Sequence, residues 1–342
     1  MANRIDVHHH YLPEAYVNAY HDANLTLAKG FFPNWTVEAD TAFSISQQIS
    51  STIFSLTAPA TAFVHGAAAN ALARSVNEYG ALLMSSDPEK YGFFATVPDL
   101  CDGLGPVLEE VRYALDELKA DGVTLLTRYG NDFHYLGHPD FLPLWDELEK
   151  RKAVVYVHPT QLASPTLVNQ FLLQPALDFP HETARAAMDL ITRNVIRDHP
   201  SVKIILSHAG GTLPYIAFRA AVLLPDAHSS NDKSTEEIMQ EARSFYFDLA
   251  LSGNEYQLSL ISKFAKPGHL LFGSDFPYTS NRALDKFTNN LDKFEWSAEE
   301  RKAANWGNAL KLFPRFAGVT AEPVRPSRIM ERARRSFMAS VS

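Results

Sequence analysis

Eight short apolar runs, separated by helix-like or irregular segments, constrain the fold of this chain more than any other feature of its sequence. Most of the runs are apolar at consecutive rather than alternate positions: Ile5–His8, Thr52–Thr57, Gly92–Val97, Gly122–Thr127, Val154–His158, Lys203–His208, Phe245–Leu249 and Leu270–Asp275. Continuous apolar character is typical of parallel strands that are covered by helices on both faces.

Amphipathic stretches lie between these runs. In Leu104–Lys119, five apolar residues form one stripe and the charged residues lie off it. Phe141–Lys152, His181–Asp198 and Ser234–Arg243 are predicted to be further helices. A strand that alternates with a helix eight times predicts an α/β fold, the (β/α)8 TIM barrel. We assign residues 1–320 to this single domain, with loop insertions over the C-terminal face of the barrel.

The end of the chain has a different composition. From Pro323 onward there are five arginines and one acid, Glu331. We interpret residues 321–342 as a basic C-terminal tail or as an arm that contacts a partner subunit. A solvated tail is the simpler alternative.

Two long segments break the regular alternation, Leu25–Ser50 and Gln161–Pro180. Both follow a strand, so as loops they would lie over the C-terminal mouth of the barrel. Their apolar residues could form the wall of an aromatic pocket or could be ordinary loop packing. These residues are Phe31, Phe32, Pro33, Trp35, Phe171, Leu172, Leu173 and Phe179.

The first strand-like run ends in three histidines. Residues i and i+2 of a strand share a face, so His8 and His10 should project together with Asp6 below them. Ile5, Val7 and His9 should then face the other way. Two imidazoles side by side on a rigid strand can bind a metal ion, and we predict that His8 and His10 do so.

Three more candidate residues follow the apolar part of their runs: His158, His208 and Asp275. The active sites of such barrels lie at the C-terminal ends of the strands, so these side chains should meet the histidine pair. The neighbours expected to share their lumen face are Tyr156 for His158, Leu206 for His208 and Gly273 for Asp275. We predict the metal ligands His8, His10, His158 and Asp275. His208 is assigned a catalytic role beside them, with a role as a further ligand as the alternative.

Composition excludes several classes of function. The net charge of −8 and the absence of a dominant basic stripe argue against nucleic acid as a partner. No apolar run approaches the roughly 18 residues of a membrane-spanning helix. The single Cys101 fits a reducing compartment, and with no targeting segment we expect a cytoplasmic protein. No nucleophile-elbow, dinucleotide-binding or phosphate-binding loop motif is present.

These motifs resemble those of the amidohydrolase superfamily, and within it the aminocarboxymuconate-semialdehyde decarboxylase-like branch. The matching segments are Ile-Asp-Val-His8-His-His10, Val-His158-Pro, Ser-His208-Ala-Gly-Gly and Phe-Gly-Ser-Asp275-Phe-Pro. The fourth strand ends in Leu126-Thr127, where the wider superfamily carries a carboxylated lysine, which indicates a mononuclear site. The opening histidine run and Gly-Thr-Leu-Pro-Tyr after His208 are most similar to the 6-methylsalicylate decarboxylases of this branch.

The resemblance implies one divalent metal ion, zinc or in some members manganese, with no organic cofactor, and a homodimer. It also singles out Arg219, eleven residues after His208, at the place where the semialdehyde decarboxylase presents an arginine to the partner's active site. A guanidinium group suits a substrate carboxylate. The alternative is an ordinary arginine on a surface helix.

We therefore expect metal-dependent, non-oxidative decarboxylation of a hydroxylated aromatic acid, with 6-methylsalicylate converted to 3-methylphenol and carbon dioxide as the best single reaction. Asp275 is the expected proton donor, because a carboxylic acid at a metal can have its pKa moved toward the working range. His208 would orient Asp275 or bound water, and attack by a metal-bound hydroxide is an alternative mechanism. Two other functions are a metal-dependent hydrolase of a lactone or amide, and a barrel that serves only as a binding subunit.

Overall fold

The computed structural model of the chain describes residues 3–25, 32–130, 134–161, 167–224 and 232–318. Eight strands form one parallel sheet. In sheet order they are β1 (Arg4–His10), β2 (Ile49–Ser55), β3 (Tyr91–Ala95), β4 (Gly122–Leu126), β7 (Val154–His158), β8 (Lys203–Leu206), β9 (Tyr246–Asp248) and β10 (Leu270–Leu271). Two short strands, β5 (Arg128–Tyr129) and β6 (His134–Tyr135), form a separate antiparallel hairpin. The predicted tail 321–342 lies outside the described residues.

The first and last strands of the sheet meet and nearly close it into a barrel. The backbone N–H of Val7 donates to the carbonyl of Phe272 at 3.1 Å, and that of His10 donates to the carbonyl of Phe276 at 2.8 Å. His9 and Phe276 form a parallel bridge. The predicted (β/α)8 barrel is thus confirmed, and β1 and the segment after β10 lie side by side.

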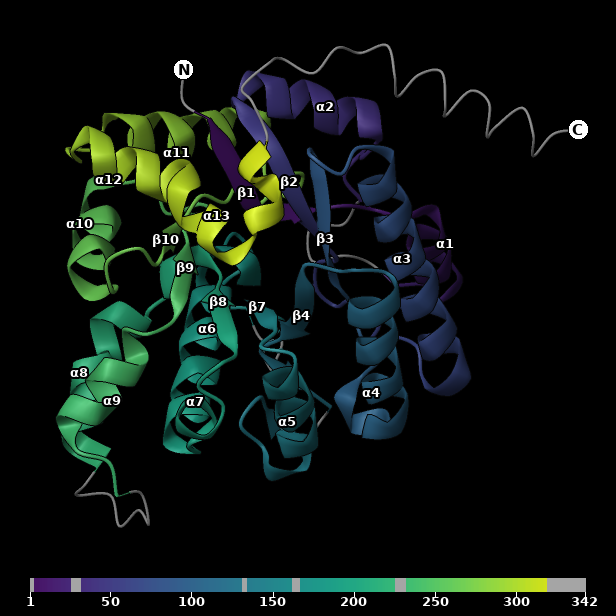
Figure 1. The fold of residues 1–342 in the computed structure, drawn as a ribbon, viewed down its shortest axis with the longest axis horizontal. Helices are drawn as coiled ribbons and strands as arrows, with labels where there is room; N and C mark the ends of the chain where they lie inside the picture. The colour runs from purple at the N-terminus through teal and green to yellow at the C-terminus, as the bar shows by residue number, and fades with distance from the viewer. Residues whose placement is uncertain (1–2, 26–31, 131–133, 162–166, 225–231, 319–342) are drawn as a thin grey trace, which may run out of the picture.

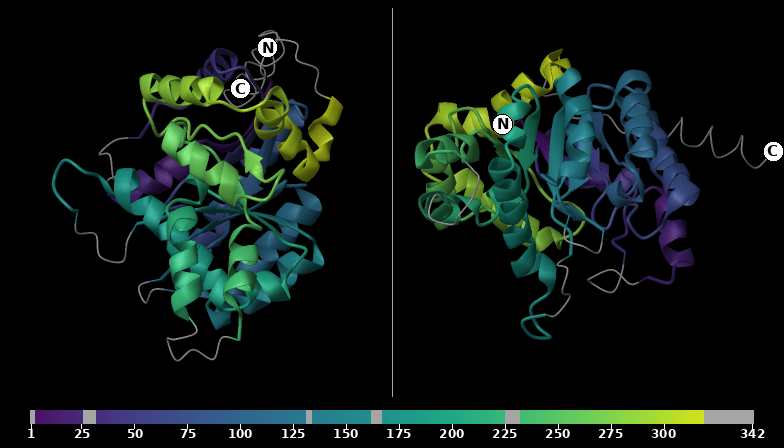
Figure 2. Two further views of the ribbon diagram at one scale, coloured as in Figure 1. Left: turned by 90° about the vertical axis from the view of Figure 1, so that its left-hand side faces the viewer. Right: turned by 90° about the horizontal axis from the view of Figure 1, so that it is seen from below.

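Helices enclose the strands, as two views at right angles show (Figure 2). They are α1 (Glu14–Asp22), α2 (Val37–Ser46), α3 (Gly66–Ser86), α4 (Leu104–Arg112), α5 (Leu142–Lys150), α6 (Gln174–Thr192), α7 (Val195–Asp198), α8 (Leu213–Leu223), α9 (Thr235–Ala242), α10 (Glu255–Phe264), α11 (Asn281–Lys293), α12 (Ala298–Lys302) and α13 (Asn308–Leu312). Within the described ranges, no helix combines the length and apolar character needed to cross a membrane.

The inside of the barrel is packed with side chains from its own strands. Ile53, Phe94 and Ile205 belong to this inner cluster, and Phe313 and Phe316, at and after the end of α13, pack against them. Helix α13 accordingly lies across the strands in Figure 1. The N-terminal end of the barrel is therefore filled by apolar side chains, which leaves polar chemistry to the C-terminal end.

Two predicted loops contain helices. Helix α2 lies inside the segment predicted as Leu25–Ser50, and its N-cap is Thr36, whose hydroxyl accepts a hydrogen bond from the Ala39 N–H at 3.1 Å. Helix α6 begins at Gln174, so the second loop is shorter than predicted. Pro175 lies in the first turn of α6, where proline is compatible with a helix. Pro180 lies in the interior of α6, where proline is unusual, and for this reason the sequence pattern predicted an irregular segment.

Two predictions of which strand residues face the inside of the barrel were wrong. The pairing of β1 with β2 shifts register between Asp6 and His9, so the simple alternation does not hold along β1. Ile5 and Val7 therefore belong to the inner cluster, although they were expected to face away from the lumen. In β8 it is Ile205 that faces inward, and the expected Leu206 packs in the outer cluster against the helices.

Candidate metal centre

The four predicted ligands converge at the C-terminal end of the barrel. Their donor atoms all lie within 4.8 Å of one another, and all four residues are buried: His8, His10, His158 and Asp275. The Nε2 atoms of His8 and His10 are 3.2 Å apart. Asp275 Oδ1 lies 3.4 Å from the first of these atoms and 3.2 Å from the second. Three imidazoles and one carboxylate are a donor set that suits zinc and related divalent ions.

The other nitrogen of each of these three histidines has a fixed partner. His10 Nδ1 lies 3.0 Å from the Ser55 hydroxyl, and His158 Nδ1 donates to the Pro159 carbonyl at 2.7 Å. Outer partners of this kind set the tautomer and the ring orientation of a metal-binding histidine. They direct the Nε2 atoms toward a common point, so the residues fit a bound cation.

Asp248, at the end of β9, is the outer partner of His8 and is not among the residues predicted from the sequence. Its Oδ2 lies 3.0 Å from His8 Nδ1, and its Oδ1 accepts from the backbone N–H groups of His208 at 3.1 Å and Ala250 at 3.0 Å. Its side chain is fully buried. The available signal was an acid near the C-terminal end of the seventh apolar run, a position comparable to that of Asp275.

Charges within the cluster shift the pKa values of its members. Burial alone would lower the pKa of His8, but the carboxylates of Asp248 and Asp275 raise it to about 10. Burial and the neighbouring His10 and His8 lower the pKa of His158 well below its usual value, which favours the neutral ligand form. Burial would raise the pKa of Asp275, but His8 and His10 hold it well below its usual range. The direction is opposite to the upward shift predicted for a carboxylic acid that donates a proton.

His208 lies beside the ligands and uses its Nδ1–H to donate to the Ala250 carbonyl at 3.2 Å. Its ring centroid is 4.7 Å from that of His8. Burial and the charge of His8 lower its pKa, so the imidazole is neutral and Nε2 is left as an acceptor. The backbone turns sharply here, with φ 55° at His208, and Gly211 brings this turn against α6. An added Cβ at Gly211 would lie 1.9 Å from the Pro180 carbonyl oxygen.

The family model described as Amidohydrolase matches residues 5–315. The chain belongs to the amidohydrolase family. It is 47% identical over 317 residues to a 6-methylsalicylic acid decarboxylase from Penicillium expansum, an alignment that covers 92% of this chain and 98% of that protein. The resemblance stated from the motifs is thereby confirmed.

Solved structures give the same fold. A crystal structure of an amidohydrolase II superposes with a TM-score of 0.82 at 29% identity, covering 91% of this chain and 99% of the other. A dihydroxybenzoic acid decarboxylase from Polaromonas sp., solved with manganese and the inhibitor 2-nitroresorcinol, has a TM-score of 0.78 at 21% identity and covers 92% and 97%. The decarboxylase structure contains a divalent metal ion. Because the two sequences are only 21% identical, the similarity is evidence for the fold of this chain and not for its function.

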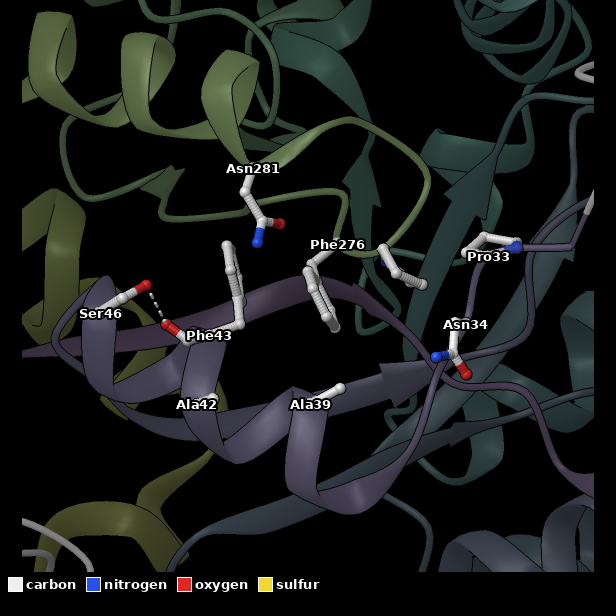
Figure 3. A pocket seen from close by; sticks show the side chains of 9 residues that line it. Pro33, Asn34, Ala39, Ala42, Phe43, Ser46, Phe276 and Asn281 are labelled. Carbon is white, nitrogen blue, oxygen red and sulfur yellow. Dashed lines mark hydrogen bonds between the residues drawn. The ribbon is translucent and has the colours of Figure 1, made fainter.

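In this amidohydrolase, His9 points away from the ligands, as predicted. It lies 3.0 Å from the carboxylates of both Asp6 and Asp40, so Asp6 pairs with His9 rather than lying below His8 and His10 as predicted. Its ring packs against Phe43 and Phe276. Beyond these rings is a cleft between α2 and the segment after β10 (Figure 3). The cleft is lined by Pro33, Asn34, Ala39, Ala42, Phe43, Ser46, Phe276, Pro277 and Asn281.

Aromatic residues approach the ligands from several elements. The Phe179 ring lies 6.4 Å from His158, in keeping with the predicted pocket wall. The Tyr278 ring lies 5.4 Å from His10, and its hydroxyl group has no hydrogen-bond partner among the described residues. Burial raises the pKa of Tyr278 well above its usual value, so this hydroxyl is neutral. Tyr278 is not among the residues predicted from the sequence.

Other members of the predicted pocket wall lie elsewhere. Phe32 packs on Tyr20 with ring centroids 4.9 Å apart, and Trp35 packs on Phe54 at 6.0 Å. Phe171 is 85% exposed and turned to solvent. Phe31 lies outside the described residues. The wall near the ligands is thus made by Phe179 rather than by Phe171.

Arg219 is not brought to the metal centre of its own chain. It lies on α8 and is exposed, next to the exposed Tyr215 and Phe218 on the same helix. Its predicted role depends on a second copy of the chain.

Proposed function

We propose that the protein is a metal-dependent, non-oxidative decarboxylase of a hydroxylated aromatic carboxylic acid, with 6-methylsalicylate as the preferred substrate. The observation that carries this proposal is a mononuclear donor set on a chain 47% identical, over 92% of its length, to a 6-methylsalicylic acid decarboxylase. Non-oxidative decarboxylation needs a proton donor and charge stabilisation but no redox cofactor. The buried cluster offers both.

His8, His10, His158 and Asp275 are proposed to hold one divalent ion, zinc by preference of the donor set, with manganese as the alternative. The bound ion would supply Lewis acidity that stabilises negative charge on substrate oxygen atoms. The neighbouring Phe179 and Tyr278 rings suit an aromatic substrate, and the Tyr278 hydroxyl can donate to one of its oxygen atoms.

Asp275 is proposed to move the proton. The structure holds the pKa of Asp275 low, so its carboxylate first has to accept a proton, and the ortho-hydroxyl group of the substrate can provide it. Asp275 then delivers this proton to the ring carbon that bears the carboxylate. The bond to the carboxylate breaks, its electron pair restores the aromatic ring, and carbon dioxide leaves. The phenolate product finally takes a proton from water.

His208 is proposed to position Asp275 and the substrate. Its Nδ1–H is held by the Ala250 carbonyl, and Asp248 accepts from its backbone N–H. Nε2 is thus available to accept a hydrogen bond from the substrate or from water at a fixed place beside the ligands. A neutral imidazole here can guide a proton without competing for it.

We further propose a homodimer in which Arg219 of one subunit binds the substrate carboxylate in the other. The exposed side chains that flank Arg219 support this arrangement, since Tyr215 is 81% and Phe218 62% exposed. Large exposed aromatic residues gathered on one helix are typical of a protein interface. A charge-assisted, two-point contact with the carboxylate would orient the ring over the ligands.

The test is incubation of the purified metal-loaded protein with 6-methylsalicylate and no organic cofactor. We expect 3-methylphenol and carbon dioxide in equal amounts. A panel of other hydroxybenzoates determines the preferred ring substitution. Turnover of a lactone or amide to a ring-opened or cleaved acid without gas release, together with no turnover of any salicylate, would refute the decarboxylase and favour the hydrolase.

A further inference from the structure

Asp6 is a buried carboxylate that contacts both of the chain segments between which the barrel closes. Its side chain, on β1, is fully buried. Its Oδ1 atom accepts hydrogen bonds from the backbone N–H groups of His8 and Ser274, each at 3.1 Å. His8 belongs to β1, whereas Ser274 follows β10 and is 268 residues further along the chain. One oxygen atom therefore links the first strand of the barrel to the segment after its last strand.

The contact to His8 fixes the local backbone of β1. An aspartate that accepts from the N–H two residues further on forms an Asx turn. This turn lies where the pairing of β1 with β2 shifts register, between Asp6 and His9. Val7 belongs to the inner cluster, yet the next residue, His8, also points inward to the proposed ligands. Asp6 thus stabilises the irregularity that lets His8 reach the metal centre.

The contact to Ser274 holds the backbone beside Asp275. Asp275 has φ 66°, a left-handed conformation that a residue other than glycine keeps only where surrounding contacts hold it. Its N–H donates to the His8 carbonyl at 2.8 Å. The N–H of Ser274 is shared between the same carbonyl, at 3.2 Å, and Asp6 Oδ1. The Asp6 carboxylate is thus one of the contacts that hold the strained backbone of Asp275 beside His8.

The Asp6 carboxylate is itself held in place by a buried histidine. Its Oδ2 atom lies 3.0 Å from His9 Nδ1, and His9 Nε2 lies 3.0 Å from Asp40 Oδ1 on α2. The side chains of all three residues are fully buried. A buried carboxylate is costly unless it is hydrogen-bonded, and a structural ion pair with His9 would satisfy this need. Such a pair accounts for Oδ2 but not for the contact of Oδ1 to Ser274.

We propose that Asp6 is a positioning residue of the metal centre, because its Oδ1 atom joins the backbones that carry His8 and Asp275 and so sets the separation of their side chains. This inference rests on the proposed metal ligands. Metal–nitrogen and metal–oxygen bonds of about 2.0–2.2 Å are expected to vary by only about 0.2 Å. A small displacement of one backbone against the other would therefore change the coordination of the ion.

Three substitutions of Asp6 separate its contacts. Asp6→Ala removes all of them. Asp6→Ser can keep the local bond to the His8 N–H, as serine does in turns, but its shorter side chain does not reach Ser274. Asp6→Asn keeps an acceptor oxygen for both N–H groups, and its NH2 group can donate to a neutral His9 whose remaining proton is on Nε2. Asp40→Asn is the matched control, because it disturbs the same buried histidine and leaves the Oδ1 contacts in place.

The experiment uses the purified full-length proteins, freed of metal and then loaded with Co²⁺. The visible absorption spectrum of the bound ion reports its coordination geometry, and competition with a chelator gives its affinity. The unmutated protein should bind about one ion per chain. We expect Asp6→Ala and Asp6→Ser to change the spectrum and to weaken binding by about 10–100-fold, the range for loss of an outer partner of a metal ligand. Asp6→Asn and Asp40→Asn should keep the spectrum and bind within about threefold of the unmutated protein.

The inference is overturned if Asp6→Ala and Asp6→Ser bind Co²⁺ with the spectrum and affinity of the unmutated protein. It is also overturned if Asp40→Asn changes both as much as they do, because the effect would then come from the buried ion pair and not from the contact to Ser274. If Asp6→Ala does not fold, Asp6→Ser decides between these outcomes. A failure of the unmutated protein to bind Co²⁺ is a distinct result, which would refute the proposed metal centre and this inference together.

Discussion

Replacing Asp248 by Asn tests the assignment of the metal centre most directly. The carboxylate makes three contacts, to His8 Nδ1 at 3.0 Å and to the N–H groups of His208 and Ala250 at 3.1 and 3.0 Å. An asparagine oxygen can still accept from the two backbone groups, and its NH2 group then faces His8. His8 Nδ1 would have to accept this hydrogen bond, which places the proton on Nε2, the atom that should bind the ion.

The expected loss follows from this change of tautomer. Removal of an outer carboxylate partner weakens metal binding by about 10–100-fold, or about 1.4–2.8 kcal/mol. Competition with a chelator of known affinity, followed by metal analysis, measures this change. Activity with 6-methylsalicylate at limiting metal should fall in parallel and should recover when excess metal is added.

Asp40→Asn is the matched control. Asp40 also pairs with a buried histidine at 3.0 Å, but that histidine is His9, on the opposite face of β1. We expect this variant to unfold more easily while its metal affinity stays within about threefold of the unmutated protein, a change below 1 kcal/mol. The reasoning is refuted if Asp248→Asn binds the ion as tightly as the unmutated protein. Equal losses in the two variants would also refute it, because the effect would then reflect general destabilisation.

Three further outcomes are expected. His158→Ala should retain much less metal after dialysis than the unmutated protein, and full metal content with full activity in that variant would remove His158 from the ligand set. Arg219→Ala should raise the Michaelis constant roughly 10–100-fold, because a charged hydrogen bond contributes about 1.5–3 kcal/mol. Mixing this variant with Asp275→Ala should restore activity toward half of normal per mixed dimer, and proven subunit exchange without recovery would exclude a role in trans. Glu147→Gln should lose about 1 kcal/mol of stability at neutral pH. Hydrogen bonds from Arg112 lower the pKa of Glu147 to about 2, so the difference should shrink as the pH falls from about 4.5 toward 2, and a difference unchanged in acid-unfolding curves would contradict this assignment.

The sequence predicts the barrel and the ligands for one physical reason. Parallel strands buried on both faces are continuously apolar, so a His or Asp at the end of such a run is conspicuous, as His158 and Asp275 are. Asp248 is a comparable acid, but in the predicted run Phe245–Leu249 it is followed by Leu249, so it does not mark the end of the apolar run. Its role as a partner of His8 depends on tertiary contacts that no spacing within the chain reveals.

Side-chain directions near strand ends were harder to predict. The register shift in β1 turns Asp6 toward His9, and local alternation cannot foresee a bulge. His208 follows the end of β8 and has a positive φ, so the alternation of side chains along the strand does not extend to it. The face on which Leu206 lies therefore does not predict the direction of the His208 side chain. Helix α2 has a Thr36 cap and early acids, which were usable signals, but it lacks a continuous apolar stripe: Ile45 is 53% exposed.

The seam of the barrel is where β1 meets the segment after β10, and the proposed ligands His8, His10 and Asp275 lie on its two sides. An ion shared by them would act as a cross-link between the beginning and the end of the barrel sequence. Bringing His10 and Asp275 together closes a loop that contains almost the whole barrel, and this closure costs conformational entropy. An ion that binds only the closed barrel stabilises that form by mass action. Removal of the metal should therefore lower the local stability of this seam first. We expect amide hydrogen exchange in β1 to become faster under conditions in which the rest of the barrel stays folded.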